Sequence, residues 1–312
     1  MSAQQDVPSV PASSLGRVAV LGATGLLGGA LRQTLRAKGA EVIGFSRSER
    51  SGAGEWARWN PDAGEIDRDA LGGVQVVVNL AGEDLSRGRW TRDRKQRLWD
   101  SRIKSTELLA STLAALDTPP RVLVNASAIG FYGDRGDEAV DEASAPGDGF
   151  LSELCRAWET ATEPAREAGV RVVLMRYGVI LTPSGGALAR MLGPFRLGVG
   201  GRLGAGTQRF PWIALPDAVG ATRFVMTREE IEGPVNVVAP ESVTNRQLTD
   251  TLGAVLRRPT VLPVPSFALS LAMGEMAREA VLAGANVRPR QLEVSGYRFE
   301  FPRLEDALGA MV

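Results

Sequence analysis

Residues 17–28 read RVAVLGATGLLG, an apolar run followed by glycines in the spacing GxxGxxG. The run 17–21 is typical of a buried strand, and apolar residues recur at helical spacing over 30–37. A strand, a glycine turn and a helix in this order bind the phosphates of a dinucleotide, because the N-terminus of a helix attracts an anion. The alternative is a glycine-rich turn that holds no ligand. We predict that the turn binds a coenzyme through Gly22, Thr24, Gly25, Leu26, Leu27 and Gly28.

The end of the next predicted strand, 41–45, indicates which dinucleotide is bound. An acidic residue at this point would hold the ribose hydroxyls of NAD. This chain has Ser46 and Arg47 instead. An arginine attracts the 2'-phosphate of NADP, whereas a carboxylate repels it. The sequence therefore favours NADP(H), with NAD(H) as the alternative if Arg47 is only a solvated surface residue.

The rest of the chain alternates strands with helices, which predicts an α/β fold. Further strands are expected over 74–80, 121–127, 170–176 and 234–238, and helices over 92–116, 150–168, 216–226, 244–256 and 270–282. We predict a Rossmann-type, doubly wound parallel sheet with a smaller C-terminal substrate lobe. The proposed division is a loose tail over 1–15, a coenzyme domain over 16–181 completed by about 216–240, and a lobe over 182–215 and 241–312. The glycine-rich part of that lobe is expected to consist mainly of loops.

The composition excludes several kinds of catalysis. The 312 residues include no histidine and one cysteine, Cys155. Ser-His-Asp hydrolysis, Cys-His catalysis and zinc sites built on histidine or several cysteines are thus ruled out, and we expect no metal. A single cysteine cannot form an intramolecular disulfide, which fits a cytoplasmic location. Cys155 itself is most simply a small buried apolar residue.

The charge balance bears on the partners. Lys plus Arg and Asp plus Glu both number 36, so the chain has no net field to attract a polyanion. We therefore expect neither nucleic acid nor a membrane as partner. No stretch is apolar over the length needed to span a bilayer, and the first residues lack the pattern of a signal peptide. A small-molecule substrate is the expected ligand, and a homodimer is an option.

Several motifs together indicate a family. They include GATGLLG at 22–28, NLAGE at 79–83, SAIGFYGDRG at 127–136, FLSELCRAWE at 150–159 and GYRFEFPRLEDAL at 296–308. With these motifs the chain resembles the extended short-chain dehydrogenase/reductases, the nucleotide-sugar epimerase-like group. It is most similar to a subgroup labelled epimerase family proteins or cell-division-inhibitor-like proteins. The resemblance extends from residue 18 to the C-terminus and implies that the coenzyme is also lined by Asn79, Leu80, Ala81 and Gly82.

The resemblance also implies a catalytic set, which this chain keeps only in part. Typical members use a Ser together with a Tyr and a Lys in the spacing YxxxK. Ser127 matches the Ser, but Phe150 and Leu154 stand where the Tyr and Lys would be. Because neither side chain has an ionisable proton, the usual mechanism cannot run at these positions. The candidates to replace the pair are Tyr132 and Glu83, and the alternative for both is a structural role.

These observations lead to competing hypotheses of function. The first is an NADP(H)-dependent oxidoreductase or epimerase that acts on a small or sugar-like carbonyl or alcohol, with Ser127, Tyr132 and Glu83 as catalytic candidates. The second is an NADP(H)-binding regulatory protein that has lost turnover, as Phe150 and Leu154 suggest. Turnover with a panel of carbonyl compounds would separate the two.

Overall fold

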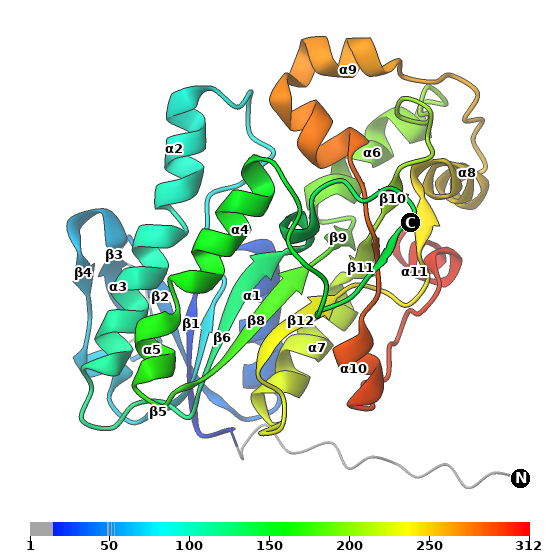
Figure 1. Ribbon diagram of the computed structural model, residues 1–312. Coiled ribbons are helices and arrows are strands. Elements are labelled where there is room, and N and C mark those ends of the chain that lie inside the picture. Colours follow the sequence, from blue (N-terminus) through cyan, green and yellow to red (C-terminus); the bar gives the residue numbers. More distant parts are fainter. Residues whose placement is uncertain (1–14, 49, 51, 53) are drawn as a thin grey trace, which may run out of the picture.

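A mostly parallel sheet forms the centre of the computed structural model, which describes residues 15–48, 50, 52 and 54–312 (Figure 1). The predicted tail lies outside these residues except for Leu15, which is buried. In spatial order the sheet contains β12 (Gly233–Val237), β8 (Arg171–Tyr177), β6 (Val122–Ala128), β5 (Val74–Asn79), β1 (Arg17–Leu21), β2 (Glu41–Ser46), β3 (Trp56–Asn60) and β4 (Glu65–Ile66). All neighbours pair in parallel except β3 and β4.

The winding of the sheet reverses at β1. This strand pairs with β2 on one side and with β5 on the other, so the chain builds outward in both directions from the centre. The C-terminal ends of β1, β2 and β5 consequently meet along one edge, where open α/β sheets bind their ligands. The prediction of a Rossmann-type, doubly wound parallel sheet is confirmed.

Helices cover both faces of this sheet (Figure 1). One face carries α1 (Leu26–Ala37) and α7 (Leu215–Met226), and the other carries α3 (Ile103–Ala114), α4 (Phe150–Thr160) and α5 (Glu163–Glu167). Side chains of β1 alternate between the faces: Val18 and Val20 belong to one buried cluster, and Ala19 and Leu21 to another. A strand buried on both faces therefore reads as a continuous apolar run, which is the pattern at 17–21.

Each of the long helices predicted from the sequence is broken. The stretch 92–116 forms α2 (Arg92–Asp100) and α3, separated where the Ser101 hydroxyl donates to the Leu98 carbonyl oxygen (3.0 Å). The stretch 150–168 forms α4 and α5, separated where the Thr162 hydroxyl donates to the Glu159 carbonyl oxygen (2.6 Å). Local hydrogen bonds of this kind compete with those of a helix, and a simple periodicity does not reveal them.

The C-terminal lobe contains more regular structure than the sequence predicted. Its main elements are β9 (Val179–Thr182), α6 (Gly186–Arg196), β11 (Trp212–Ala214), α8 (Asn245–Leu256), α9 (Ser266–Met273), the π-helical η5 (Ala277–Leu282), α10 (Arg290–Val294) and α11 (Leu304–Met311). The lobe also contains the short strands β10 (Arg209–Phe210), β13 (Val243–Thr244) and β14 (Asn286–Val287). Short elements outside the lobe are η2 (Pro61–Ala63), η3 (Asp69–Leu71), η4 (Ile129–Tyr132) and β7 (Ala139–Val140). The helix predicted over 270–282 is interrupted at Gly274, where φ is 65°. Across the described ranges, none of the helices is both long and apolar enough to cross a bilayer.

A separate hydrophobic cluster holds this lobe together. Leu188 of α6, Trp212 of β11, Leu248 of α8 and Leu308 of α11 belong to it, and all are buried. The cluster supports the proposed division into a coenzyme domain and a lobe, which stays a prediction.

Candidate functional site

The glycine turn between β1 and α1 has no room for a side chain at two of its glycine positions. Gly22 has a φ of 74°, and a Cβ at this position would lie 2.6 Å from the Leu80 carbonyl oxygen. A Cβ on Gly28 would lie 2.2 Å from the Gly22 carbonyl oxygen. The Gly25 N–H donates to that same oxygen (2.9 Å) and closes the turn. Contacts between backbone segments therefore require glycine at positions 22 and 28.

Helix α1 presents a site for an anion at its N-terminus. No side chain caps the helix at Gly25, and its first turn contains no acidic residue. Thr24, Gly25 and Leu26 are exposed, whereas Leu27 packs into the core. The first N–H groups of a helix have no partner within it, and the helix dipole makes them attractive to negative charge. The turn is thus suited to hold a pyrophosphate.

Basic side chains gather at the C-terminal end of β2. Arg47 is exposed, and Ser46 is buried beside it. The Arg50 Nε donates to the Ser46 Oγ (3.3 Å), and the Ser48 N–H donates to the same oxygen (3.3 Å). The sequence analysis missed Arg50, although it is the second arginine of the SRSER segment at 46–50. Together, Arg47 and Arg50 form a cationic rim suited to a phosphate.

An aromatic ring extends this rim toward α1. The guanidinium carbon of Arg50 lies 5.0 Å from the centre of the Trp56 ring, and that of Arg32 lies 4.3 Å from it. Arg32 also forms an ion pair with Glu55 (2.9 Å), which Arg36 shares (2.9 Å). Glu55 therefore pairs with Arg32 and Arg36, and among the described residues neither Arg47 nor Arg50 forms an ion pair.

Buried amides fix the loop after β5. The Asn79 side chain donates to Asn125 Oδ1 (2.7 Å) and accepts the Ala81 N–H (3.3 Å). The Leu80 N–H donates to the Leu21 carbonyl oxygen (3.0 Å) at the end of β1. The structure therefore brings the predicted residues from Asn79 onward beside the glycine turn.

Gly82 in this loop faces the guanidinium of the buried Arg102. A Cβ on Gly82 would lie 3.2 Å from the Arg102 Cζ. Arg102 Nη2 donates to the Glu83 carbonyl oxygen (3.0 Å), and burial lowers the pKa of Arg102 to about 10. The buried Arg102 side chain thus fixes the conformation of the loop that contains Gly82 and Glu83.

Glu83, a predicted catalytic candidate, shares no hydrogen-bond partner with Ser127 among the described residues. Its carboxylate forms an ion pair with the buried Arg94, and its N–H donates to the Ser101 Oγ (3.1 Å). Arg94 also bonds to the Asp84 carbonyl oxygen. This pairing favours the structural alternative for Glu83.

The other two catalytic candidates meet in a buried polar network, which we call the Glu159 network. The Ser127 Oγ donates to Glu159 Oε1 (2.6 Å). Arg176 donates to both oxygens of the same carboxylate: Nε to Oε1 and Nη2 to Oε2, each at 2.8 Å. Arg176 Nη1 donates to the Tyr132 hydroxyl (3.0 Å), which in turn donates to Asn236 Oδ1 (2.7 Å). Ser127 and Tyr132 are thus joined through a buried ion pair at the C-terminal ends of β6 and β8.

The Tyr132 hydroxyl faces the protein interior. Tyr132 is 0% exposed, and burial raises the pKa of its phenol even though Arg176 lies beside it. Burial likewise raises the pKa of Tyr177, bonded to Thr222, and of Tyr297, bonded to Asp217. These are all the tyrosines in the chain. None of them is placed to form a phenolate near neutral pH, which argues against Tyr132 as a direct acid or base.

Apolar side chains replace the missing Tyr-Lys pair on α4. Phe150 packs edge-on against Trp90 with ring centres 5.5 Å apart, and Leu154 is buried. Cys155 follows in the same buried surface, and its burial raises the pKa of the thiol to about 12. This position keeps Cys155 protonated, in line with the prediction of a buried apolar residue.

A cavity of about 390 Å³ opens beside Phe150. Its lining residues are Trp90, Arg92, Lys95, Gln96, Trp99, Phe150 and Glu275. The Lys95 Nζ lies 4.4 Å from the centre of the Phe150 ring and pairs with Glu275 of the C-terminal lobe (2.8 Å). The sequence analysis did not identify Lys95, because the sequence does not show that α2 reaches the start of α4.

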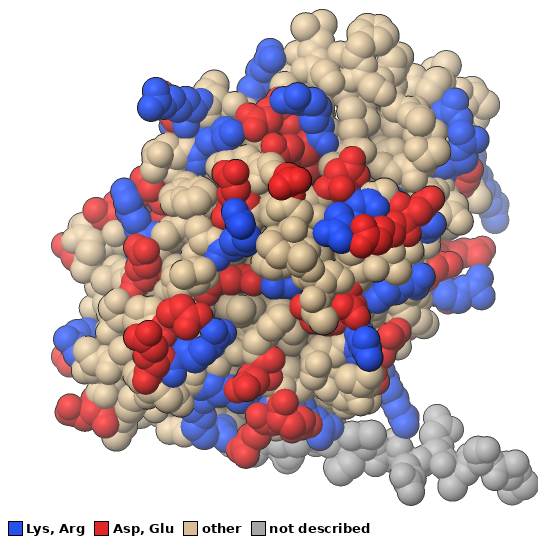
Figure 2. All heavy atoms as spheres, in the orientation of Figure 1, with Lys and Arg blue, Asp and Glu red and all other residues tan. Residues whose placement is uncertain are grey.

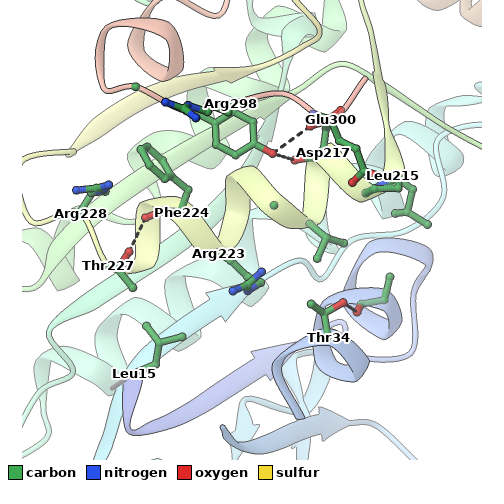
Figure 3. Close-up of a pocket in the computed structure, with 16 residues that line it drawn as sticks. Leu15, Thr34, Leu215, Asp217, Arg223, Phe224, Thr227, Arg228, Arg298 and Glu300 are labelled. Carbon is green, nitrogen blue, oxygen red and sulfur yellow. Dashed lines mark hydrogen bonds between the residues drawn. The ribbon is translucent and has the colours of Figure 1, made fainter. Parts of the chain in front are cut away.

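A larger groove of about 620 Å³ lies between α1, α7 and the chain segment around Tyr297 (Figure 3). Asp217 at the start of α7 organises its wall. The Asp217 carboxylate accepts the N–H groups of Glu300 (2.7 Å) and Phe301 (2.8 Å), and the Tyr297 hydroxyl donates to it (3.2 Å). Asp217 therefore anchors the C-terminal segment to the Rossmann domain.

The parallel sheet, the glycine turn and the arginine rim define a dinucleotide-binding protein of the Rossmann class. Comparison with known proteins is more specific. Residues 18–238 match the NAD dependent epimerase/dehydratase family, and residues 264–311 match a domain of unknown function, DUF1731. The chain belongs to the NAD dependent epimerase/dehydratase family, which confirms the resemblance inferred from the motifs.

Relatives are found in bacteria and in animals. An epimerase family protein of Mycobacterium tuberculosis is 44% identical over 292 residues, covering 94% of this chain and 96% of the relative. Human epimerase family protein SDR39U1 is 36% identical and covers 95% of this chain and 99% of the relative. The crystal structure of the human protein with NADPH superposes with a TM-score of 0.87 at 35% identity, covering 95% of this chain and 98% of that one. A nucleoside-diphosphate sugar epimerase from Corynebacterium glutamicum has a TM-score of 0.78 at 34% identity, covering 96% of this chain and 60% of that one.

Proposed function

We propose that the protein binds NADP(H) and acts as an oxidoreductase or epimerase on a small or sugar-like carbonyl or alcohol, without the usual Tyr-Lys pair. The observation that carries this proposal is the glycine turn beside an arginine rim. In support, the similar human structure contains NADPH, and one similar bacterial structure is a nucleoside-diphosphate sugar epimerase.

The residues of the turn fit the proposed coenzyme. The N–H groups at the start of α1 would hold the pyrophosphate, and Arg47 with Arg50 would hold the 2'-phosphate. The segment from Asn79 to Gly82 would line the coenzyme beyond the end of β5. When bound, NADP(H) supplies or accepts a hydride, and the protein provides binding, orientation and any proton that is needed.

Replacing Arg47 with aspartate should reverse the coenzyme preference. The new carboxylate repels the 2'-phosphate and bonds to ribose hydroxyls, so NADPH affinity should fall by roughly a hundredfold, about 3 kcal/mol, while NADH affinity changes little. Isothermal titration with both coenzymes measures this. Lys38→Asp, the same change of charge on an exposed residue after α1, is the matched control. Equal losses for the two coenzymes would exclude Arg47 as the phosphate reader.

Lys95 is our candidate for the proton donor. It is held against Phe150, at the place of the family's Tyr, and Glu275 orients its ammonium group. In carbonyl reduction the ammonium group would donate a proton to the substrate oxygen, and the amine would take it back in the reverse direction. The cavity beside Phe150, with aromatic walls and the cationic Arg92, would hold the substrate.

Changing Lys95 to methionine should slow carbonyl reduction by about a hundredfold and leave NADPH affinity unchanged. Lys104→Met, which removes an exposed lysine, is the control. Oxidation of NADPH is followed by its absorbance over a panel of aldehydes, ketones and sugars. Wild-type turnover that Lys95→Met does not reduce would disprove the role of Lys95.

A second candidate function is a coenzyme-dependent regulator without turnover. The hydroxyls of all the tyrosines, which are hydrogen-bonded within the protein, and the apolar pair Phe150 and Leu154 favour it. This candidate gains if NADPH binds but is not oxidised with any carbonyl compound, and if a protein partner is retained only when NADPH is present.

A further inference from the structure

The C-terminal lobe ends in a surface that is apolar and exposed. Six of the eight exposed large apolar side chains among the described residues belong to it. We call this surface the lobe tip, and it consists of Leu197, Val199, Val261, Leu262, Phe267 and Leu271. Figure 2 shows the corresponding region, over α6 and α9, as a largely uncharged projection at the upper right of the molecule.

The backbone joins the parts of the lobe tip into one surface. Gly201 bridges to Val261, and Leu203 bridges to Val264, so the segment after α6 lies along the segment before α9. Helix α9, SFALSLAM, has no charged residue. Its Phe267 is 75% exposed and Leu271 is 74% exposed, and four-residue spacing puts them on one side of the helix. A soluble monomer rarely exposes such a cluster unless the cluster binds something.

The charged residues around the lobe tip are mostly positive. Over 182–215 and 241–274 the sequence contains seven arginines, no lysine and only Glu241 and Asp250 as acidic residues. Arg196 directly precedes Leu197, and Arg257 and Arg258 precede Val261. These three arginines are exposed and form no ion pair with any residue in the described part of the chain. The zero net charge of the whole chain hides this local excess.

We infer that the lobe tip docks reversibly onto membranes that contain anionic phospholipids. Phe267 and Leu271 would enter the interface while Arg196, Arg257 and Arg258 bind the headgroups. The projecting shape suits a flat bilayer better than a peptide, which needs a groove, and neither cavity described above lies here. A twofold dimer through this surface would bring together two copies of the same positively charged surface, and like charges repel.

The test is co-sedimentation of the full-length protein with vesicles of phosphatidylcholine, with and without phosphatidylglycerol. We expect binding only to the anionic vesicles, and release when the salt concentration is raised. The variant Arg257→Gln/Arg258→Gln should bind the anionic vesicles roughly thirtyfold more weakly than the wild type. The variant Phe267→Ser/Leu271→Ser should bind them at least roughly tenfold more weakly. The controls are Arg68→Gln/Arg121→Gln and Val294→Ser, which change exposed residues outside the lobe tip.

Several results would overturn the inference. One is equal binding, or no binding, to the two kinds of vesicle. Another is unchanged binding by both lobe-tip double variants. The third comes from sedimentation velocity without vesicles. If the wild type is a dimer and the Phe267→Ser/Leu271→Ser variant is a monomer, the lobe tip binds a second copy of the chain. NADPH titration of each variant shows that it is folded.

Discussion

Replacing Glu159 with leucine should lower the free energy of unfolding by about 3–5 kcal/mol. The reason is the Glu159 network, in which Arg176 is buried and Glu159 is its ion-pair partner at 2.8 Å. Burial by itself lowers the pKa of Arg176, but the hydrogen bonds and charge of Glu159 raise it above its normal value. Without the carboxylate, a buried cation has no compensating charge, and Ser127 loses its acceptor. Urea unfolding followed by circular dichroism measures the effect.

The double variant Glu159→Leu/Arg176→Met is the decisive control. It removes both charges, so it should recover most of the stability that Glu159→Leu loses. Glu163→Leu removes an exposed glutamate that pairs with Arg166 and should cost less than about 1 kcal/mol. A loss below about 1 kcal/mol for Glu159→Leu would show that the buried pair does not stabilise the fold.

Replacing Gly28 with alanine should abolish coenzyme binding at working concentrations. The new Cβ would stand 2.2 Å from the Gly22 carbonyl oxygen, so the turn must move away from the start of α1. A shift that breaks two charge-assisted hydrogen bonds to phosphate removes about 3–6 kcal/mol, which weakens NADPH binding by at least about a hundredfold. Titration of the purified variant with NADPH measures the loss.

Gly29→Ala is the matched control for this experiment. A Cβ on Gly29 would lie 3.8 Å from the Ala23 carbonyl oxygen, which is an ordinary contact. Alanine also favours a helix over glycine, so this variant should bind NADPH as the wild type does and be slightly more stable. Retention of NADPH by Gly28→Ala would rule out the glycine turn as the pyrophosphate site.

The central sheet and the coenzyme turn follow from local patterns. A strand that is buried on both faces needs apolar residues throughout, which gives a continuous run such as 17–21. A turn in which backbone packs directly on backbone needs glycine, here Gly22 and Gly28. The strand β3, which lies between β2 and the edge strand β4, was missed because it is half-buried: Ala57 and Trp59 are buried, Arg58 is exposed, and the polar residues hide the strand pattern. The breaks in the long helices were missed because they depend on side chains that turn back onto the backbone.

The environment of the candidate catalytic residues depends on packing between segments that are distant in the sequence. Ser127 and Tyr132 are five positions apart, but the partners that bury them, Glu159, Arg176 and Asn236, come from three other elements. Lys95 reaches Phe150 only because α2 lies against the start of α4. Sequence spacing encodes periodicity along one element, so it predicted the strands, the turn and the coenzyme. Whether a hydroxyl faces a ligand or the interior is decided by how separate elements pack together.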